Sequence, residues 1–317
     1  MPFAFVFAGQ GSQSVGMLRE LAAVEPVVRA TFEEASRVLG YDLWTLVREG
    51  PEETLNATER TQPAMLAAGV ATWRAWRARG GAAPALVSGH SLGEFTALVC
   101  ADALAFPATI DLVRFRGQVM QEAVPAGHGA MAALLGLDDE AVLAVCREAA
   151  RGAVVEAVNF NSPGQVVIAG HAAAVERAIA AAKTRGAKRA VTLPVSVPSH
   201  SSLMRAAGER LRERLAAIEV RPPGIPYVSA VDARPHEDPQ DIREVLVRQL
   251  SSPVRWPQTL RTLAQGKVTA VIECGPGRVL TGLNRRIERR ADLDFFALED
   301  PASIDTALKA TGGKAHA

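Results

Sequence analysis

The sequence predicts an α/β fold in which a small domain is inserted into a larger one built on a parallel sheet. Short apolar runs bounded by glycine alternate with helix-periodic stretches through most of the chain, and this pattern favours buried parallel strands joined by helices. The middle of the chain instead follows the order strand–helix–strand–strand–helix–strand. The length of 317 residues agrees with two domains, since a domain takes roughly 150 residues.

The larger domain opens with an apolar run that stops at Gly9-Gln10-Gly11. Three later runs have the same character, and helical periodicity fills the segments between them. Strands are expected at residues 3–7, 84–88, 227–231 and 268–273. Helices are expected at residues 63–79, 94–101, 110–123 and 203–218.

The middle segment has the element order of a ferredoxin-like unit. An acidic residue opens its first helix, and Asn-Ser-Pro-Gly forms a turn by composition. The elements are expected at residues 130–137, 138–150, 154–160, 166–169, 172–185 and 189–195. The small domain therefore spans residues 128–195, and the large domain spans 1–127 and 196–317. The last residues, from about Thr311, are expected to fray.

Composition and charge exclude several functional classes. The net charge is +1, with 48% hydrophobic and 22% charged residues, so the chain is globular and not a nucleic-acid-binding protein. Its 3 cysteines are far apart and form no C-x-x-C pair, which argues against disulfides and a metal site. The sequence contains no signal peptide and no apolar stretch long enough for a membrane span. We expect a cytoplasmic protein with no membrane association.

The sharpest local signal is Gly89-His90-Ser91-Leu92-Gly93, which lies between a predicted strand and a predicted helix. It fits G-x-S-x-G, in which a tight turn presents a nucleophilic serine. The following helix directs unpaired N–H groups at the same point, where they stabilise a developing oxyanion. Ser91 is therefore the candidate nucleophile, and the alternative is a serine in an inert glycine-rich loop.

A serine hydroxyl needs a base, and the chain has six histidines. His200 follows the predicted small domain, where a cleft between domains would form. The others are less suitable: His90 adjoins the serine and should point away from it, and His236 is expected in a polar loop. His171 is expected at a helix start and His316 lies in the tail, so the remaining histidine is His128.

Two further features are candidates for ligand contacts. The Gln10 turn fails as a dinucleotide-binding fingerprint because Ser14 stands where the third glycine belongs, but its backbone could approach a ligand closely. Arg114 and Arg116 lie on the predicted helix at 110–123. An arginine that points into a pocket binds a carboxylate through paired donors, although most helical arginines are solvated.

Several motifs that occur together and in order resemble one family, the malonyl-CoA:acyl carrier protein transacylases of bacterial fatty acid synthesis. The resemblance extends from Phe3 to about Leu298, and some of the motifs also occur in polyketide synthase acyltransferase domains. The family fold implied is an α/β-hydrolase-like core with a ferredoxin-like insertion. The motifs are Gly9-Gln10-Gly11-Ser12-Gln13, Gly89-His90-Ser91-Leu92-Gly93-Glu94, Arg116-Gly117 with Met120-Gln121, Asn159-Phe160-Asn161-Ser162-Pro163-Gly164-Gln165, Pro198-Ser199-His200 and Gly275-Pro276-Gly277.

The resemblance implies a role for each matching site residue. Ser91 would be acylated and His200 would be its base, while Gln10 and Leu92 would supply the oxyanion-hole N–H groups. Substrate binding would rest on Arg116, which pairs with the malonyl carboxylate, and on Gln249, whose main-chain carbonyl orients the His200 ring.

The resemblance also implies the reaction and its partners. A malonyl group would pass from malonyl-CoA through a malonyl-serine to the phosphopantetheine thiol of acyl carrier protein, without metal or cofactor, in a chain expected to be monomeric. An esterase or thioesterase on the same core remains the alternative; it would need a carboxylate on the histidine. Candidate docking surfaces for the acidic carrier protein are two basic clusters, Lys183, Arg185, Lys188 and Arg189, and Arg285, Arg286, Arg289 and Arg290.

Overall fold

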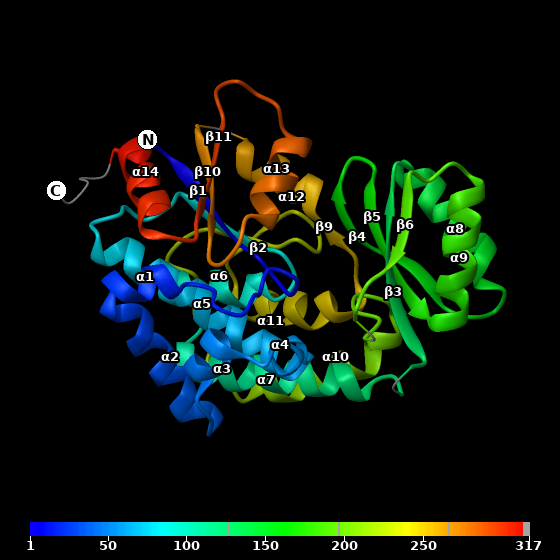
Figure 1. Cartoon of the computed structure of the whole chain (residues 1–317), viewed down its shortest axis with the longest axis horizontal. Helices are drawn as coiled ribbons and strands as arrows, with labels where there is room; N and C mark the ends of the chain where they lie inside the picture. Colours follow the sequence, from blue (N-terminus) through cyan, green and yellow to red (C-terminus); the bar gives the residue numbers. More distant parts are fainter. Residues whose placement is uncertain (126, 196, 266, 313–317) are drawn as a thin grey trace.

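Two β-sheets organise the chain, so the predicted mixed α/β class is confirmed (Figure 1). The structure is a computed structural model and describes residues 1–125, 127–195, 197–265 and 267–312. One sheet has six strands in the order β11-β10-β1-β2-β7-β8, and the other has five in the order β6-β3-β5-β4-β9. The six are β1 (Phe3–Phe7), β2 (Leu86–Gly89), β7 (Tyr227–Val228), β8 (Pro235–His236), β10 (Ala270–Cys274) and β11 (Asp294–Leu298).

The six-stranded sheet is parallel except for its edge strand β8, which pairs antiparallel with β7. Strand β1 occupies the predicted residues and is buried along its whole length between β10 and β2. The strand predicted at 227–231 is shorter than expected. After Val228 the chain turns back, with Ser229 N–H bonded to Arg234 O at 3.0 Å, and this turn creates β8, which the sequence analysis did not predict.

Helices cover both faces of this sheet (Figure 1). Helix α5 begins at Thr58, ahead of the predicted start at residue 63, so that Pro63 lies inside it. The four helices before α5, the four helices after residue 238 and strand β11 were not predicted. The helices are α1 (Arg19–Val24), α2 (Pro26–Leu39), α3 (Leu43–Glu49), α4 (Glu52–Asn56), α5 (Thr58–Ala78), α6 (Gly93–Cys100), α7 (Phe106–Glu122), α10 (Arg205–Ala216), α11 (Pro239–Arg248), α12 (Trp256–Ala264), α13 (Val279–Ile287) and α14 (Pro301–Thr311), with 3-10 turns η1 (Ser202–Met204) and η2 (Gln249–Ser251).

The five-stranded sheet contains the elements predicted for the small domain. Asp138 caps α8 by accepting a hydrogen bond from Ala141 N–H at 2.8 Å, as expected of an acidic N-cap. Strand β4 continues through the first two residues of the predicted turn, so the turn itself is Pro163-Gly164. The elements are β3 (Gly129–Leu135), α8 (Asp139–Ala150), β4 (Val155–Ser162), β5 (Gln165–His171), α9 (Ala172–Thr184), β6 (Arg189–Thr192) and the added strand β9 (Val254–Arg255).

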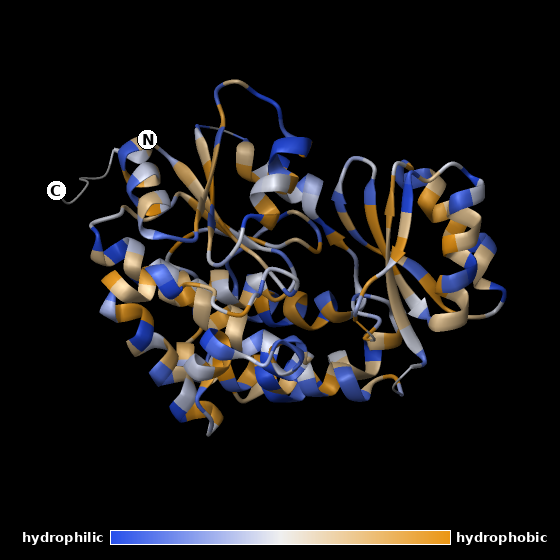
Figure 2. Cartoon of the chain, viewed as in Figure 1, coloured by the Kyte–Doolittle hydropathy of each residue, from blue (hydrophilic) through white to orange (hydrophobic). Residues whose placement is uncertain are grey.

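The two faces of this smaller sheet have different neighbours. Helices α8 and α9 cover one face and share with it a core of alanine, valine and leucine side chains, seen as orange strands and inward helix faces in Figure 2. A second apolar cluster, which includes Met131, Val158 and Val167, lies on the other face. Strand β9 adds to the edge of β4 in parallel, so a segment outside residues 128–195 joins the sheet.

Three other expectations concern the cysteines, membrane-spanning helices and the end of the chain. Cys100, Cys146 and Cys274 are all buried free thiols. Within the described ranges, no helix combines the length and the apolar character needed to cross a membrane. Thr311 is the buried last residue of α14, and the remainder of the predicted frayed end, with His316, lies outside the described residues.

Candidate active site

Ser91 lies in a strained turn between β2 and α6. Its φ of 53° is in the left-handed region, which costs free energy for a residue with a side chain. The two neighbouring glycines permit this turn. A Cβ on Gly89 would lie 1.9 Å from Gly93 C, and a Cβ on Gly93 would lie 1.9 Å from Phe7 O. The strand, the turn and the helix are therefore packed backbone against backbone at this point.

His200 contacts the Ser91 hydroxyl. Its Nε2 lies 2.8 Å from Ser91 Oγ, and its Nδ1 lies 2.8 Å from the main-chain oxygen of Gln249. Because a carbonyl oxygen only accepts hydrogen bonds, the Nδ1 atom carries the proton and Nε2 is free to accept one from the serine. Burial and the nearby positive charge of Arg116 lower the pKa of His200 to about 3, so the ring is neutral at pH 7.

Arg116 extends from α7 toward the serine, with 1% of its surface exposed. Its Nη1 donates to Gln62 Oε1 at 2.8 Å, and its Nη2 lies 2.9 Å from Gln249 Oε1 and 3.3 Å from Ser91 Oγ. Burial lowers the pKa of Arg116 to about 10, so it remains a cation. The alternative candidate Arg114 instead pairs with Asp111 at 2.6 Å at the surface.

The side chain of Gln249 connects these groups to a buried carboxyl group. Its Nε2 donates to Ser91 O at 2.9 Å and to Glu94 Oε1 at 2.8 Å. Glu94 also accepts a hydrogen bond from the Tyr227 hydroxyl. No role was predicted for Glu94, for Gln62 or for the side-chain amide of Gln249. An acidic residue in the first turn of a helix is common, so nothing in the local sequence distinguished Glu94.

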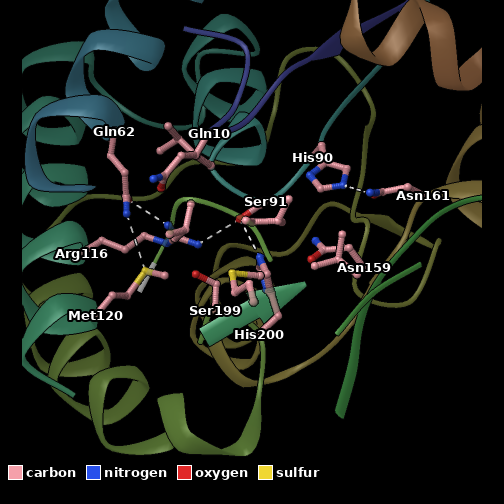
Figure 3. A pocket seen from close by; sticks show the side chains of 15 residues that line it. Gln10, Gln62, His90, Ser91, Arg116, Met120, Asn159, Asn161, Ser199 and His200 are labelled. Atoms are coloured by element: carbon pink, nitrogen blue, oxygen red, sulfur yellow. Dashed lines mark hydrogen bonds between the residues drawn. The ribbon is translucent and has the colours of Figure 1, made fainter. Parts of the chain in front are cut away.

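Ser91, Arg116 and His200 line a cavity of about 190 Å³ between the two sheets (Figure 3). Gln10 lies on one side of it, and its neighbour Gly9 packs against the serine turn, since a Cβ there would lie 2.5 Å from His90 O. The lining residues are Gln10, Gln62, His90, Ser91, Leu92, Arg116, Met120, Met131, Asn159, Asn161, Val167, Leu193, Val195, Ser199 and His200.

Three other histidines have contacts of their own. His90 bonds Asn161 Oδ1 through Nε2 at 2.9 Å, so its ring is directed away from the Ser91–His200 contact (Figure 3). His171 N-caps α9 and accepts from Val154 N–H. The expectation of a polar loop around His236 was wrong: the residue ends strand β8 and its side chain is buried, and its two ring nitrogens bond the carboxylates of Asp232 and Asp241.

No described carboxylate contacts the His200 ring, where a hydrolase triad would have one. Two aspartates that lie between Ser91 and His200 in the sequence, Asp111 and Asp138, have other partners. Asp111 bonds Arg114 and Arg214, and Asp138 caps α8.

The nucleophile Ser91, the neutral base His200 and the buried cation Arg116 meet at one cavity. Such a site can transfer an acyl group that carries its own carboxylate.

Comparisons with known proteins agree with one another. A model of the acyl transferase domain matches residues 4–293. The chain is 55% identical to the malonyl CoA-acyl carrier protein transacylase of Salmonella typhimurium over 306 residues, which cover 96% of this chain and 98% of the relative.

Two solved structures are similar throughout. One is a malonyl-transacylase in complex with its type II PKS acyl-carrier protein, with 54% identity, a TM-score of 0.96, and coverage of 98% of this chain and 100% of the other. The second is the acyl-carrier-protein S-malonyltransferase of Burkholderia pseudomallei, with 55% identity, a TM-score of 0.95 and the same coverage.

Proposed function

This chain belongs to the acyl transferase family as a malonyl-CoA:acyl carrier protein transacylase, and from that premise we propose which of its residues carry out the transfer. The malonyl group passes from malonyl-CoA to the phosphopantetheine thiol of acyl carrier protein, a step that supplies fatty acid synthesis. The observation that supports the assignment best is the chain of contacts from Gln249 O through the His200 ring to Ser91 Oγ, with both distances 2.8 Å.

In the first half-reaction, His200 Nε2 takes the proton of Ser91 Oγ, and the oxygen attacks the thioester carbonyl. The tetrahedral oxyanion is stabilised by the backbone N–H groups of Gln10 and Leu92. Leu92 immediately precedes α6, where the first N–H groups of a helix have no partner within it, and Gly9 brings the Gln10 loop against the same turn. One such donor typically contributes about 3 kcal/mol to transition-state stabilisation.

Collapse of the tetrahedral intermediate forms the malonyl-serine ester and breaks the C–S bond. The proton on His200 Nε2 passes to the sulfur of the departing coenzyme A. In the second half-reaction, the carrier's thiol loses its proton to His200 and attacks the ester. Ser91 then leaves and regains the proton. The neutral resting state of His200 suits both directions, since the ring accepts a proton and returns it in each half.

Substrate selection rests on Arg116. Its Nη2 lies 3.3 Å from Ser91 Oγ. At this distance the guanidinium can contact the free carboxylate at the far end of a malonyl group esterified to Ser91. A charge-assisted pair with the malonyl carboxylate stabilises the loaded state. An acetyl group leaves the buried cation without that partner, and this is unfavourable.

The thioester is already activated, so the proposed reaction needs no cofactor. We propose a monomer as the active species. The 3 buried cysteines remain thiols, which supports a cytoplasmic location.

We further propose an α/β-hydrolase-like core with a ferredoxin-like insertion, with domains at 1–127 plus 196–317 and at 128–195. Two observations support this. The nucleophile turn follows a parallel strand, and the order β6-β3-β5-β4 is that of a βαββαβ unit. The pairing of β9 with β4 ties the two domains together at their edge.

Both basic clusters are exposed and remain candidate surfaces for the acidic carrier protein. We favour the cluster of Arg285, Arg286, Arg289 and Arg290. Arg286 reaches across to Gln165 Oε1 at 2.8 Å, which places this cluster beside the small domain. Each cluster has one arginine in an ion pair, Arg290 with Asp292 and Arg185 with Glu148. Charge reversal of Arg286 should raise the KM for carrier protein and leave that for malonyl-CoA unchanged.

The decisive experiment is intact-mass analysis after mixing with malonyl-CoA or acetyl-CoA. We expect a mass gain of one malonyl unit that is absent in Ser91→Ala. Arg116→Ala should load malonyl poorly and lose most of its preference over acetyl. An Arg116→Ala enzyme with the original selectivity would refute the role of Arg116, and malonyl loading in Ser91→Ala would refute the nucleophile.

A further inference from the structure

Glu94 is a fully buried carboxyl group that the proposed mechanism does not use. It lies in the first turn of α6 with 0% of its surface exposed. Gln249 Nε2 donates to its Oε1 at 2.8 Å, and the Tyr227 hydroxyl donates to its Oε2. Both partners are donors, which suits an ionised carboxylate. Burial nevertheless raises the pKa of Glu94, and these hydrogen bonds only partly oppose that shift.

A buried charge needs an opposite charge nearby, and the candidate is Arg116. Neither group forms a salt bridge within the described part of the chain. One amide group joins them: Gln249 Oε1 accepts from Arg116 Nη2 at 2.9 Å, while Nε2 of the same amide donates to Glu94. Burial lowers the pKa of Arg116, and the charge of Glu94 opposes this effect. The two charges therefore stabilise each other across the amide.

The amide between them has a consequence for the substrate. A carboxylate in direct contact with Arg116 would occupy the paired donors that a malonyl carboxylate needs. Gln249 is neutral, so it orients the guanidinium without neutralising it locally. Its orientation is fixed, because its NH₂ group faces two acceptors, Ser91 O and Glu94 Oε1.

We propose that Glu94 is a positioning residue for malonyl selectivity. Its carboxylate is the buried counter-charge of Arg116, and it acts through the Gln249 amide. It keeps the guanidinium cationic and aimed at Ser91 while leaving donors available to the substrate. This inference rests on the proposed function, in which Arg116 binds the malonyl carboxylate.

The test is Glu94→Gln, which keeps the size of the side chain and removes the charge. Glu273→Gln is a matched control: Glu273 is also buried, at 1% exposed, but its partners are the Leu280 and Thr281 N–H groups rather than the Gln249 amide. Steady-state kinetics should give a KM for malonyl-CoA that rises about tenfold in Glu94→Gln, the effect of losing one charge-assisted contact. The KM for acetyl-CoA should be unchanged. Glu273→Gln should leave the KM for malonyl-CoA and the KM for acetyl-CoA unchanged.

One result would overturn this proposal alone, and a different result would show failure of the proposed function. If Arg116→Ala loses malonyl selectivity while Glu94→Gln retains it, Arg116 binds the carboxylate but Glu94 does not support it. If Arg116→Ala itself retains selectivity, the function assigned to Arg116 fails instead.

Tyr227→Phe provides a second test, which does not depend on the folding of Glu94→Gln. It removes one donor from the Glu94 carboxylate and leaves the carboxylate in place. The pKa of Glu94 should therefore rise further, and malonyl selectivity should decline at a higher pH than in the wild type as the pH is lowered. The charged or titratable groups that face Glu94 are Tyr227 and, through Gln249, Arg116 and His200. An unchanged pH profile would contradict the proposal.

Discussion

Two polar clusters lie near helix α11, and they handle charge in opposite ways: in one, a buried histidine meets ionic partners that are partly or largely exposed, and the other is largely buried. The helix-end cluster consists of Asp232, His236, Asp241 and Arg248, and the pocket cluster consists of Ser91, Glu94, Arg116, His200 and Gln249. In the helix-end cluster every charge meets an opposite charge directly, with contacts of 2.6 to 3.0 Å. In the pocket cluster the two charged groups are separated by an amide, and Arg116 Nε has no partner among the described residues.

The difference is clearest in the two histidines. His200 and His236 are almost equally buried, at 4% and 6% exposed. Burial disfavours the charged form of both. It dominates for His200, where the positive charge of Arg116 adds to it and the pKa falls to about 3. For His236, hydrogen bonds to the carboxylates of Asp232 and Asp241, together with their negative charge, outweigh burial and raise the pKa.

This contrast separates a stabilising cluster from a reactive one. Direct pairing satisfies the helix-end cluster, which anchors α11 at Asp241 in its first turn and at Arg248 in its last. The residue after that helix is Gln249, which contacts Ser91, His200 and Arg116. The helix-end cluster thus holds the segment from which the pocket cluster is built, while the pocket cluster keeps an unsatisfied cation for its substrate.

The largest expected effect comes from removing the base in the pocket cluster. His200→Ala should lower kcat on the order of 10⁴-fold, because Ser91 then has no group to take its proton. Malonyl transfer to carrier protein, followed by mass spectrometry, measures this loss. His236→Gln is the control from the helix-end cluster and should retain kcat within a few-fold. Comparable losses in the two variants would remove the distinction between the clusters.

A smaller effect is expected when the amide that joins the pocket cluster is truncated. Gln249→Ala retains the main-chain carbonyl that orients His200 but frees Arg116 and Glu94 from their common partner. Loading of Ser91 with malonyl should slow roughly 10- to 100-fold through misplacement of the guanidinium, as measured by rapid-quench acylation.

Gln240→Ala, on the exposed first turn of α11, is the matched control and should load at the wild-type rate. Equal rates for Gln249→Ala and the wild type would show that the side chain of Gln249 does not position Arg116.

The sequence was sufficient to predict most of the framework but not the polar network. The strand at residues 3–7 and the Asp138-capped helix follow from local apolar patterns and capping, which act over a few residues. Ser91 and Arg116 stood out through motifs, and the structure brings Arg116, His200 and Gln249 to Ser91 as the family resemblance implied.

What the sequence could not predict depends on contacts between distant segments. Glu94 and Tyr227 are separated by 133 positions, and neither has a local pattern that indicates burial beside the other. His236 was expected in a polar loop because its neighbours are polar. Its burial follows from the hairpin that returns at Pro235 and from carboxylates on both sides, which are tertiary features.

The smallest expected effect is a difference in the pH dependence of stability between the two histidines. The folded-state pKa of His236 is raised above the ordinary histidine pKa of 6.5. Protonated His236 therefore stabilises the fold fully below pH 6.5, and this contribution is lost as the pH rises through the folded-state pKa. His236→Gln should therefore be most destabilising near pH 6 and less so toward pH 9. The folded-state pKa of His200 is lowered to about 3, so its contribution is present above pH 6.5 and is lost as the pH falls.

The free energy of unfolding of His200→Gln, taken relative to that of the wild type, should consequently be about 2 kcal/mol higher at pH 5 than at pH 7. Thermal unfolding midpoints of the wild type and both variants between pH 5 and 9 measure these trends, and the two difference curves should slope in opposite directions. Curves with the same slope would mean that burial alone governs both rings. In that case the direct carboxylate contacts of His236 would not offset its desolvation, and the contrast between the two clusters would not hold.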